Sequence, residues 1–170
     1  VLPMGWSHSP LVAQEAHEEL LNSNSELGEA TRMREGKPWG GRRRLHFSYI
    51  DDTVVLVIGP RSQRRALEAE CDRLMGSALA AYKGAGIPVK PEKVERANVL
   101  MVVLGMVIDG LSGRVQVSPA RRRRLQVAIE RLLKVKVCNG RALSAVVGHL
   151  TWAFLVRRPL LSILWQVYRY

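Results

Sequence analysis

Two short β-rich runs, joined at a pair of aspartates, constrain the fold of this chain more than any other feature. Residues 45–50 and 53–58 are rich in β-branched and aromatic residues, and only Asp51 and Asp52 separate them. This pattern predicts a β-hairpin with a tight turn at the two aspartates. In a regular strand their side chains would point to opposite faces, whereas a turn lets both carboxylates reach one space.

Two carboxylates about 4 Å apart repel each other by roughly 4 kcal/mol at an effective dielectric near 20. A divalent cation removes that repulsion, and Mg²⁺ prefers one or two carboxylates together with phosphate and water oxygens. Two such ions can hold the attacking and leaving oxygens of a phosphoryl transfer. The competing interpretation is a solvated acidic turn, which is common in proteins.

The rest of the pattern favours the α+β class. Of the 170 residues, 47% are apolar, enough for a core, and 24% are charged, which does not indicate disorder. Apolar spacing and cap signals predict helices at 7–21, 61–83, 119–134, 140–156 and 159–169, and strands at 99–108 and 114–117. Ser118-Pro119 marks the start of the third of these helices. The second has one apolar stripe, made of Leu67, Cys71, Leu74, Ala78 and Tyr82. We expect an antiparallel sheet with helices on one face in residues 1–117, followed by an all-helical segment, 118–170. His149, Trp152 and Trp165 are expected in the core of that segment.

The charge distribution indicates a polyanionic partner. The chain carries 26 basic and 15 acidic residues, a net charge of +11, although residues 1–30 contain five Glu and no Lys or Arg. Nucleic acid is the first candidate and an anionic membrane surface the second. Four arginines at a helix start oppose the helix dipole, which favours an external anion over a solvated charged face. The two basic clusters consist of Arg42, Arg43, Arg44, Arg121, Arg122, Arg123 and Arg124.

Several protein classes are excluded by composition. Two cysteines, Cys71 and Cys138, are too few for a disulfide scaffold or a cysteine zinc site. No uncharged apolar stretch approaches the roughly 20 residues that a transmembrane helix needs. The N-terminus lacks the basic and apolar parts of a signal peptide, so we expect an intracellular protein, cytoplasmic or nuclear.

Four short motifs, in order, resemble those of reverse transcriptases. Residues 1–10 read Val-Leu-Pro-Met-Gly-Trp-Ser-His-Ser-Pro and lead to Gln14, similar to the family's Leu-Pro-x-Gly-x-x-x-Ser-Pro…Gln pattern. Residues 49–52 match its Tyr-x-Asp-Asp box. Residues 86–93 resemble the motif that ends in a lysine, and residues 103–105 resemble the Leu-Gly turn of the primer grip. The helical tail resembles, more weakly, the region after the polymerase core in retrotransposons.

This resemblance implies part of a retroelement RNA-directed DNA polymerase: a partial palm in 1–117 and a thumb- or connection-like segment in 118–170. It implies Mg²⁺ or Mn²⁺ as cofactor, and an RNA or DNA template–primer and deoxynucleoside triphosphates as partners. The implied site residues are Asp51 and Asp52 for metal and catalysis; Lys93, with Lys90 as competitor, for protonating pyrophosphate; Pro3, Gly5, Gln14 and Tyr49 for the nucleotide or template; Leu104 and Gly105 for the primer grip; and the seven arginines for the nucleic-acid backbone.

The chain also departs from the family. Family members carry a third metal-binding aspartate in an earlier motif, and this chain begins after it, so we expect a fragment that is inactive alone. Met4 stands where retroviral enzymes have glutamine, and residues 22–44 look inserted. Two alternatives follow: a catalytically dead remnant that binds nucleic acid through its arginines, or an unrelated α+β scaffold whose Asp-Asp is only a turn.

Overall fold

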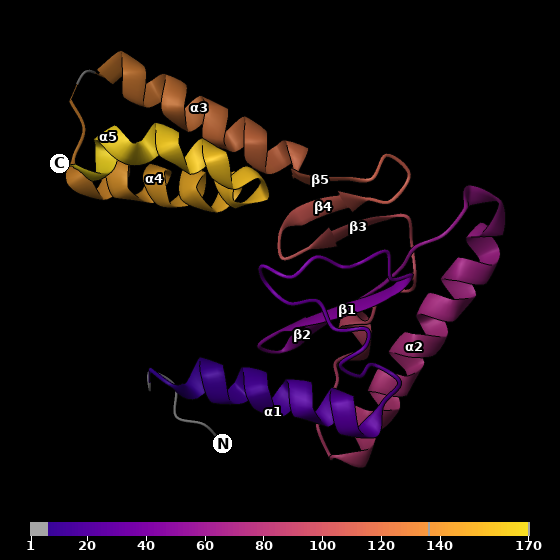
Figure 1. The fold of residues 1–170 in the computed structure, drawn as a ribbon. Helices are drawn as coiled ribbons and strands as arrows, with labels where there is room; N and C mark the ends of the chain where they lie inside the picture. The colour runs from indigo at the N-terminus through magenta and orange to yellow at the C-terminus, as the bar shows by residue number, and fades with distance from the viewer. Residues whose placement is uncertain (1–6, 136, 170) are drawn as a thin grey trace. The chain divides into compact units, whose positions relative to one another are not determined.

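The computed structural model describes residues 7–135 and 137–169 and confirms the α+β class. The chain forms two compact units, Val1–Asn98 and Val99–Tyr170, and each holds an antiparallel sheet and helices (Figure 1). The sequence predicted a boundary near residue 117. In the structure three short strands, within residues 100–117, belong to the same unit as the C-terminal helices, and the last of those strands contacts the segment Leu155–Leu164.

The first unit is a hairpin with two long helices. Its elements are α1 (Ser9–Asn24), β1 (Arg44–Tyr49), β2 (Asp52–Val57), a 3₁₀ turn η1 (Arg61–Gln63), α2 (Arg64–Gly84) and a second 3₁₀ turn η2 (Pro91–Lys93). β1 and β2 are antiparallel, with Tyr49 opposite Asp52. Both helices pack against this hairpin and against each other (Figure 1).

The core of the first unit lies between the hairpin and the helices. The apolar stripe predicted for 61–83 is present, since Leu74, Ala78 and Tyr82 of α2 are buried at a spacing of four residues. Leu21 of α1 and Val55 of β2 close the same cluster. Burying one such leucine contributes about 1.5–3 kcal/mol. The hairpin and both helices therefore share one apolar cluster.

The second unit contains a three-stranded sheet and a helical layer. Its elements are β3 (Leu100–Val103), β4 (Met106–Asp109), β5 (Arg114–Val117), α3 (Pro119–Val135), α4 (Gly140–Phe154), a 3₁₀ segment η3 (Leu155–Leu164) and α5 (Trp165–Tyr168). The strands lie in the order β3–β4–β5, all antiparallel. Asn139 caps α4, its side chain accepting the N–H of Ala142 at 2.8 Å.

Three expectations for the second unit are wrong. The single strand predicted at 99–108 is a hairpin, which turns at Leu104 and Gly105 because Gly105 readily adopts a φ of +78°. The last helix is mostly a 3₁₀ segment that contains Pro159, a residue without an N–H to donate. His149 and Trp165 are exposed, Trp165 by 62%, rather than buried. No helix in the described ranges is long and apolar enough to cross a membrane.

Candidate active site

The β1–β2 turn places a strained residue, Ile50, directly before the two aspartates. The turn residues are Ile50 and Asp51, one position earlier than predicted, and Asp52 begins β2. Ile50 has a φ of +53°, in the left-handed region that β-branched residues rarely occupy. Such strain costs about 1–3 kcal/mol and is concentrated at functional sites. Asp51 and Asp52 are exposed, and neither carboxylate has a hydrogen bond or ion pair within the described residues.

Gln14 of α1 bonds to the backbone of this turn. Its Oε1 accepts the N–H of Ile50 at 2.6 Å, and its Nε2 donates to the carbonyl of Ser48 at 2.9 Å. The same Nε2 also donates to Glu18, one turn along α1. The resemblance predicted that Gln14 contacts the nucleotide or template. In the structure its amide is instead engaged by the hairpin, on both sides of Tyr49.

His17 of α1 bonds to the other polar group of the strained residue. Its Nδ1 lies 2.8 Å from the carbonyl oxygen of Ile50, and its Nε2 lies 2.6 Å from the Tyr82 hydroxyl and 2.9 Å from Thr53 Oγ1. A carbonyl can only accept, so Nδ1 carries the proton, and in the neutral ring Nε2 accepts from a hydroxyl. Burial raises the pKa of Tyr82, which keeps its hydroxyl protonated as a donor at neutral pH.

The sequence did not identify His17, Thr53 or Tyr82 as site residues. Tyr82 was assigned only to the apolar stripe of α2. A weak local signal existed, because His17 follows Gln14 by three residues and therefore lies on the same helix face. Nothing in the local pattern joins His17 to Tyr82, which is 65 positions away.

The structure does not join the other predicted residues of the first unit to the aspartates. Tyr49, at the end of β1, is 54% exposed beside the turn. Lys93 ends η2 and Lys90 precedes it; both are exposed, and among the described residues no hydrogen bond or ion pair links either lysine to Asp51 or Asp52. Pro3 and Gly5 lie outside the described residues.

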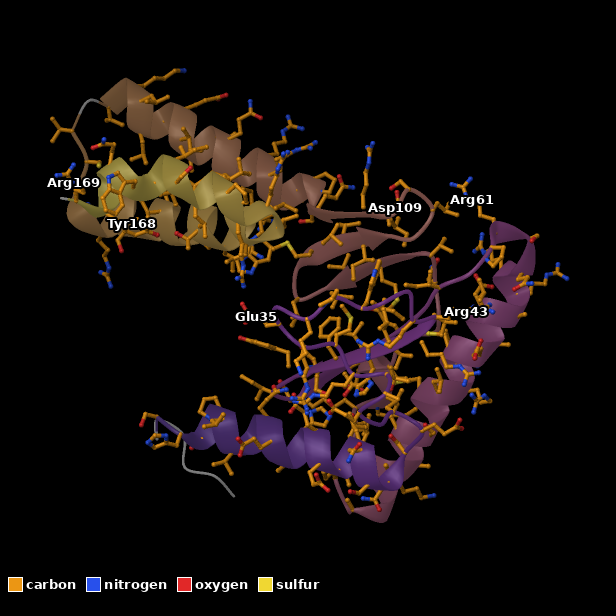
Figure 2. The ribbon with its side chains drawn as sticks, in the orientation of Figure 1. Glu35, Arg43, Arg61, Asp109, Tyr168 and Arg169 are labelled. Atoms are coloured by element: carbon orange, nitrogen blue, oxygen red, sulfur yellow. The ribbon has the colours of Figure 1, made fainter. Side chains whose placement is uncertain are left out.

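The arginines before the hairpin form contacts inside the first unit. Arg42 donates to the carbonyls of Ala30 and Trp39, at 2.9 and 2.8 Å. Arg43 donates to the carbonyl of Ile58 at 3.2 Å and to Gln63 (Figure 2), and Arg44 pairs with Glu70. These guanidiniums hold the hairpin and its preceding loop together, while Arg43 and Arg44 remain exposed with further N–H donors that these bonds do not use.

The turn predicted as the primer grip lies beside an arginine stacked on a tryptophan. Leu104 and Gly105 have φ values of +48° and +78°, and Leu104 is 42% exposed. The Arg121 guanidinium carbon stacks 3.7 Å from the ring centre of Trp152. A Cβ on Gly105 would come within 2.8 Å of Arg121 and 3.1 Å of Trp152. Glycine is therefore favoured here by its φ, and an added Cβ would also have to shift the Arg121 guanidinium and the Trp152 ring.

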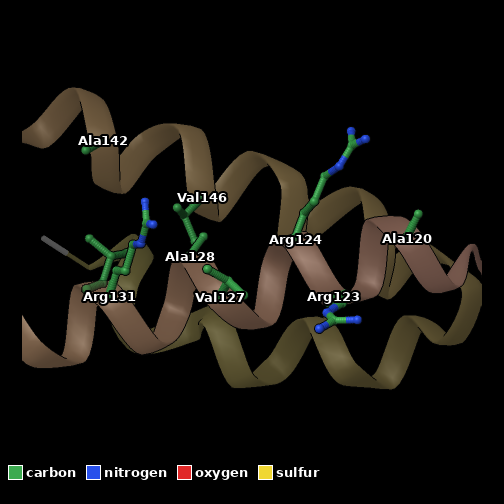
Figure 3. Close-up of a pocket in the computed structure, with 9 residues that line it drawn as sticks. Ala120, Arg123, Arg124, Val127, Ala128, Arg131, Ala142 and Val146 are labelled. Carbon is green, nitrogen blue, oxygen red and sulfur yellow. The ribbon is translucent and has the colours of Figure 1, made fainter.

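The four arginines at the start of α3 differ in exposure and in their contacts. Arg121 is half-buried on Trp152, whereas Arg122, Arg123 and Arg124 are exposed and, within the described part of the chain, form no hydrogen bond or ion pair. Arg123 and Arg124 also line a groove of about 650 Å³ between α3 and α4, and its apolar lining includes Val127 and Val146 (Figure 3). All three of these arginines are therefore open to an external anion.

The donor chemistry of the turn fits a hard divalent cation. Asp51 and Asp52 offer carboxylate oxygens without a competing basic partner among the described residues, and such oxygens suit Mg²⁺ or Mn²⁺. In the described ranges no group of three or more His, Cys, Asp and Glu side chains is placed to hold a metal ion. The described residues thus supply two adjacent, exposed carboxylates, and a cation held by them would need phosphate, water or further protein groups as its remaining ligands.

Comparisons of the chain with protein-family models, curated proteins and solved structures find no match.

Proposed function

We propose that this chain is part of the RNA-directed DNA polymerase of a retroelement, with the β1–β2 turn as its active site. The observation that supports this function is the turn at Ile50, which is strained and carries two exposed carboxylates that have no partner among the described residues. A merely solvated acidic turn needs no left-handed isoleucine, because glycine or asparagine adopts that conformation at little cost. It also needs no hydrogen bonds from a helix to both polar groups of Ile50.

In the proposed reaction the primer 3′-hydroxyl oxygen bonds to the α-phosphorus of a deoxynucleoside triphosphate, and the bond to pyrophosphate breaks. Asp51 and Asp52 would hold Mg²⁺ or Mn²⁺, and the bound cations would stabilise the charge on the attacking and leaving oxygens. Tyr49, exposed beside the turn, would contact the primer end. Lys93 would give a proton to the departing pyrophosphate.

The second unit would contribute template–primer affinity. Arg122, Arg123 and Arg124 are exposed at the start of a helix, so phosphates could reach all three. Each neutralised phosphate releases counterions and makes binding weaken with salt. The turn at Leu104 and Gly105, held under Arg121 and Trp152, would contact the primer strand.

The test is primer extension on an RNA template by the complete gene product that contains this chain. Asp51→Asn should reduce extension at least about 100-fold, because it removes a charged metal ligand, while primer–template affinity changes less than about twofold. Glu92→Gln, which removes an exposed carboxylate from η2, is the matched control and should extend at the wild-type rate. Extension by Asp51→Asn at the wild-type rate would overturn the site.

A second candidate function is nucleic-acid binding by a catalytically dead remnant. The exposed arginines of α3 favour it, since they need neither aspartate. Fluorescence anisotropy with a labelled primer–template separates the two functions. A remnant would bind without Mg²⁺, would be unaffected by Asp51→Asn with Asp52→Asn, and would extend nothing. Absence of binding at any salt concentration would instead favour the unrelated scaffold.

A further inference from the structure

We infer that His17 is a positioning residue that sets the geometry of the Asp51–Asp52 pair from outside it. This inference rests on the proposed function, in which the pair holds a divalent cation. His17 does not touch either carboxylate. It acts through the residues that flank them, Ile50 and Thr53.

The His17 imidazole bonds to both residues that flank the two aspartates. Nδ1 lies 2.8 Å from the carbonyl oxygen of Ile50, immediately before Asp51, and Nε2 lies 2.9 Å from Thr53 Oγ1, immediately after Asp52. One ring therefore ties the two ends of the Asp51–Asp52 segment together. If either bond is lost, the separation of these ends is no longer fixed by the ring.

Ile50, directly before Asp51, is the strained residue of the turn. Its N–H is bonded to Gln14 and its carbonyl oxygen to His17, so both polar groups of the left-handed residue are held by α1. Gln14 bonds to the N–H of the peptide before Ile50, whereas His17 bonds to the carbonyl oxygen of the peptide between Ile50 and Asp51. The bond from His17 fixes that peptide, and with it the direction in which Asp51 leaves the turn.

The His17 ring is itself held in place by Tyr82 and Thr53. The Tyr82 hydroxyl lies 2.6 Å from Nε2 and 2.5 Å from Thr53 Oγ1, so three side chains from α1, β2 and α2 form a closed triangle. The His17 and Tyr82 rings also pack against each other, with centroids 5.5 Å apart. Residues that orient a metal site without binding the metal typically change its affinity by 10–100-fold when mutated.

The test measures Mn²⁺ binding to the full chain by the electron paramagnetic resonance signal of free Mn²⁺. His17→Ala should weaken binding about tenfold or more. His17→Asn keeps a side-chain N–H near the place of Nδ1 and should recover part of that loss, a rescue that general destabilisation would not give. Tyr82→Phe, which removes only the hydroxyl, should weaken binding by a smaller factor and covers the case in which His17→Ala fails to fold.

His46 provides the matched control. It is also a histidine of the first unit, it is 2% exposed on β1, and it bonds to Thr31 at 2.8 Å rather than to the turn. His46→Asn should lower the unfolding midpoint but leave the Mn²⁺ dissociation constant within about twofold. A similar loss of Mn²⁺ affinity in His46→Asn and His17→Ala would overturn the inference, because it would show a general effect of destabilisation.

The double variant Asp51→Asn with Asp52→Asn distinguishes this inference from the proposed function. If the wild type binds Mn²⁺ no better than the double variant, the turn is not a metal site, and both proposals fail. If wild-type binding depends on the aspartates but His17→Ala, His17→Asn and Tyr82→Phe bind as the wild type does, the metal site stands and the role of His17 is refuted. Graded loss across the three variants supports it.

Discussion

The two units each contain a hairpin whose turn places an aliphatic residue in the left-handed region, but they support it differently. At the β1–β2 turn, Ile50 is β-branched, is not followed by glycine, and is held by hydrogen bonds from Gln14 and His17. At the β3–β4 turn, Leu104 is followed by Gly105, and the turn lies under the stacked pair of Arg121 and Trp152.

This difference separates a turn that positions charges from a turn that provides shape. Hydrogen bonds are directional, so they fix the orientation of the peptide groups beside Asp51 and Asp52. Stacking and van der Waals contact fix where the backbone lies but leave its polar groups free. The two units also differ in their interiors: most of the fully buried apolar residues lie in the first, whereas only Val107, Val147 and Leu164 are buried in the described part of the second.

The largest effect that we expect to separate the two units is a loss of stability in the first unit at acidic pH. Burial, with a smaller effect of Arg32, lowers the pKa of His46 from 6.5 to about 4. The folded form therefore binds a proton less readily than the unfolded chain, so this contribution is complete above pH 6.5 and is lost as the pH falls toward 4. The loss should reach about 3 kcal/mol in urea denaturation followed by circular dichroism.

His46→Asn checks the assignment of this pH dependence. The variant cannot take up the proton, so its stability should change less between pH 6.5 and 4 than that of the wild type, by about the same 3 kcal/mol. An unchanged pH dependence in His46→Asn would assign the loss to other groups.

The next effect concerns the turn that provides shape. Gly105→Ala places a side chain at a φ of +78° and within 3.1 Å of Trp152, and should cost about 2 kcal/mol or more in the free energy of unfolding. Gly113→Ala is the control, since Gly113 has a φ of +64° but no atom within 4 Å of the added Cβ. It should cost about 1 kcal/mol. Equal costs in urea denaturation would show that the contact with Arg121 and Trp152 is not tight.

Much of the fold followed from local patterns in the sequence. The stripe of α2 and the Ser118-Pro119 helix start predicted helices close to those observed, and the β1–β2 turn was predicted to within one residue. At the β3–β4 turn the apolar pattern predicted one buried strand over 99–108, because only Gly105 interrupts it, whereas the family resemblance predicted a Leu-Gly turn at 103–105.

The support of the candidate site was less predictable than the aspartates themselves. Asp51 and Asp52 are adjacent in sequence, and their place in a Tyr-x-Asp-Asp box, among the other ordered motifs, distinguished them from a solvated acidic turn. The contacts of His17 with Ile50 and Tyr82 cross 33 and 65 positions and depend on how α1 and α2 pack on the hairpin. Single-sequence patterns contain the periodicity of each helix but not the pairing between helices, so these contacts required the structure.

The smallest expected effect comes from removing the strain at Ile50, and it tests whether that strain helps to orient the Asp51 carboxylate. Ile50→Gly removes the strain of a β-branched residue at a φ of +53° but adds the chain entropy of glycine, so stability should rise by only about 0.5 kcal/mol. Leu104→Gly should give a similar gain in urea denaturation. The two variants should differ in Mn²⁺ binding. Ile50→Gly should weaken it, because a more flexible residue before Asp51 allows more orientations of the Asp51 carboxylate. Leu104→Gly should leave it unchanged. If Ile50→Gly binds Mn²⁺ as tightly as the wild type, the hydrogen bonds of Gln14 and His17 fix the turn whatever residue occupies position 50, and the left-handed isoleucine is not needed for the site.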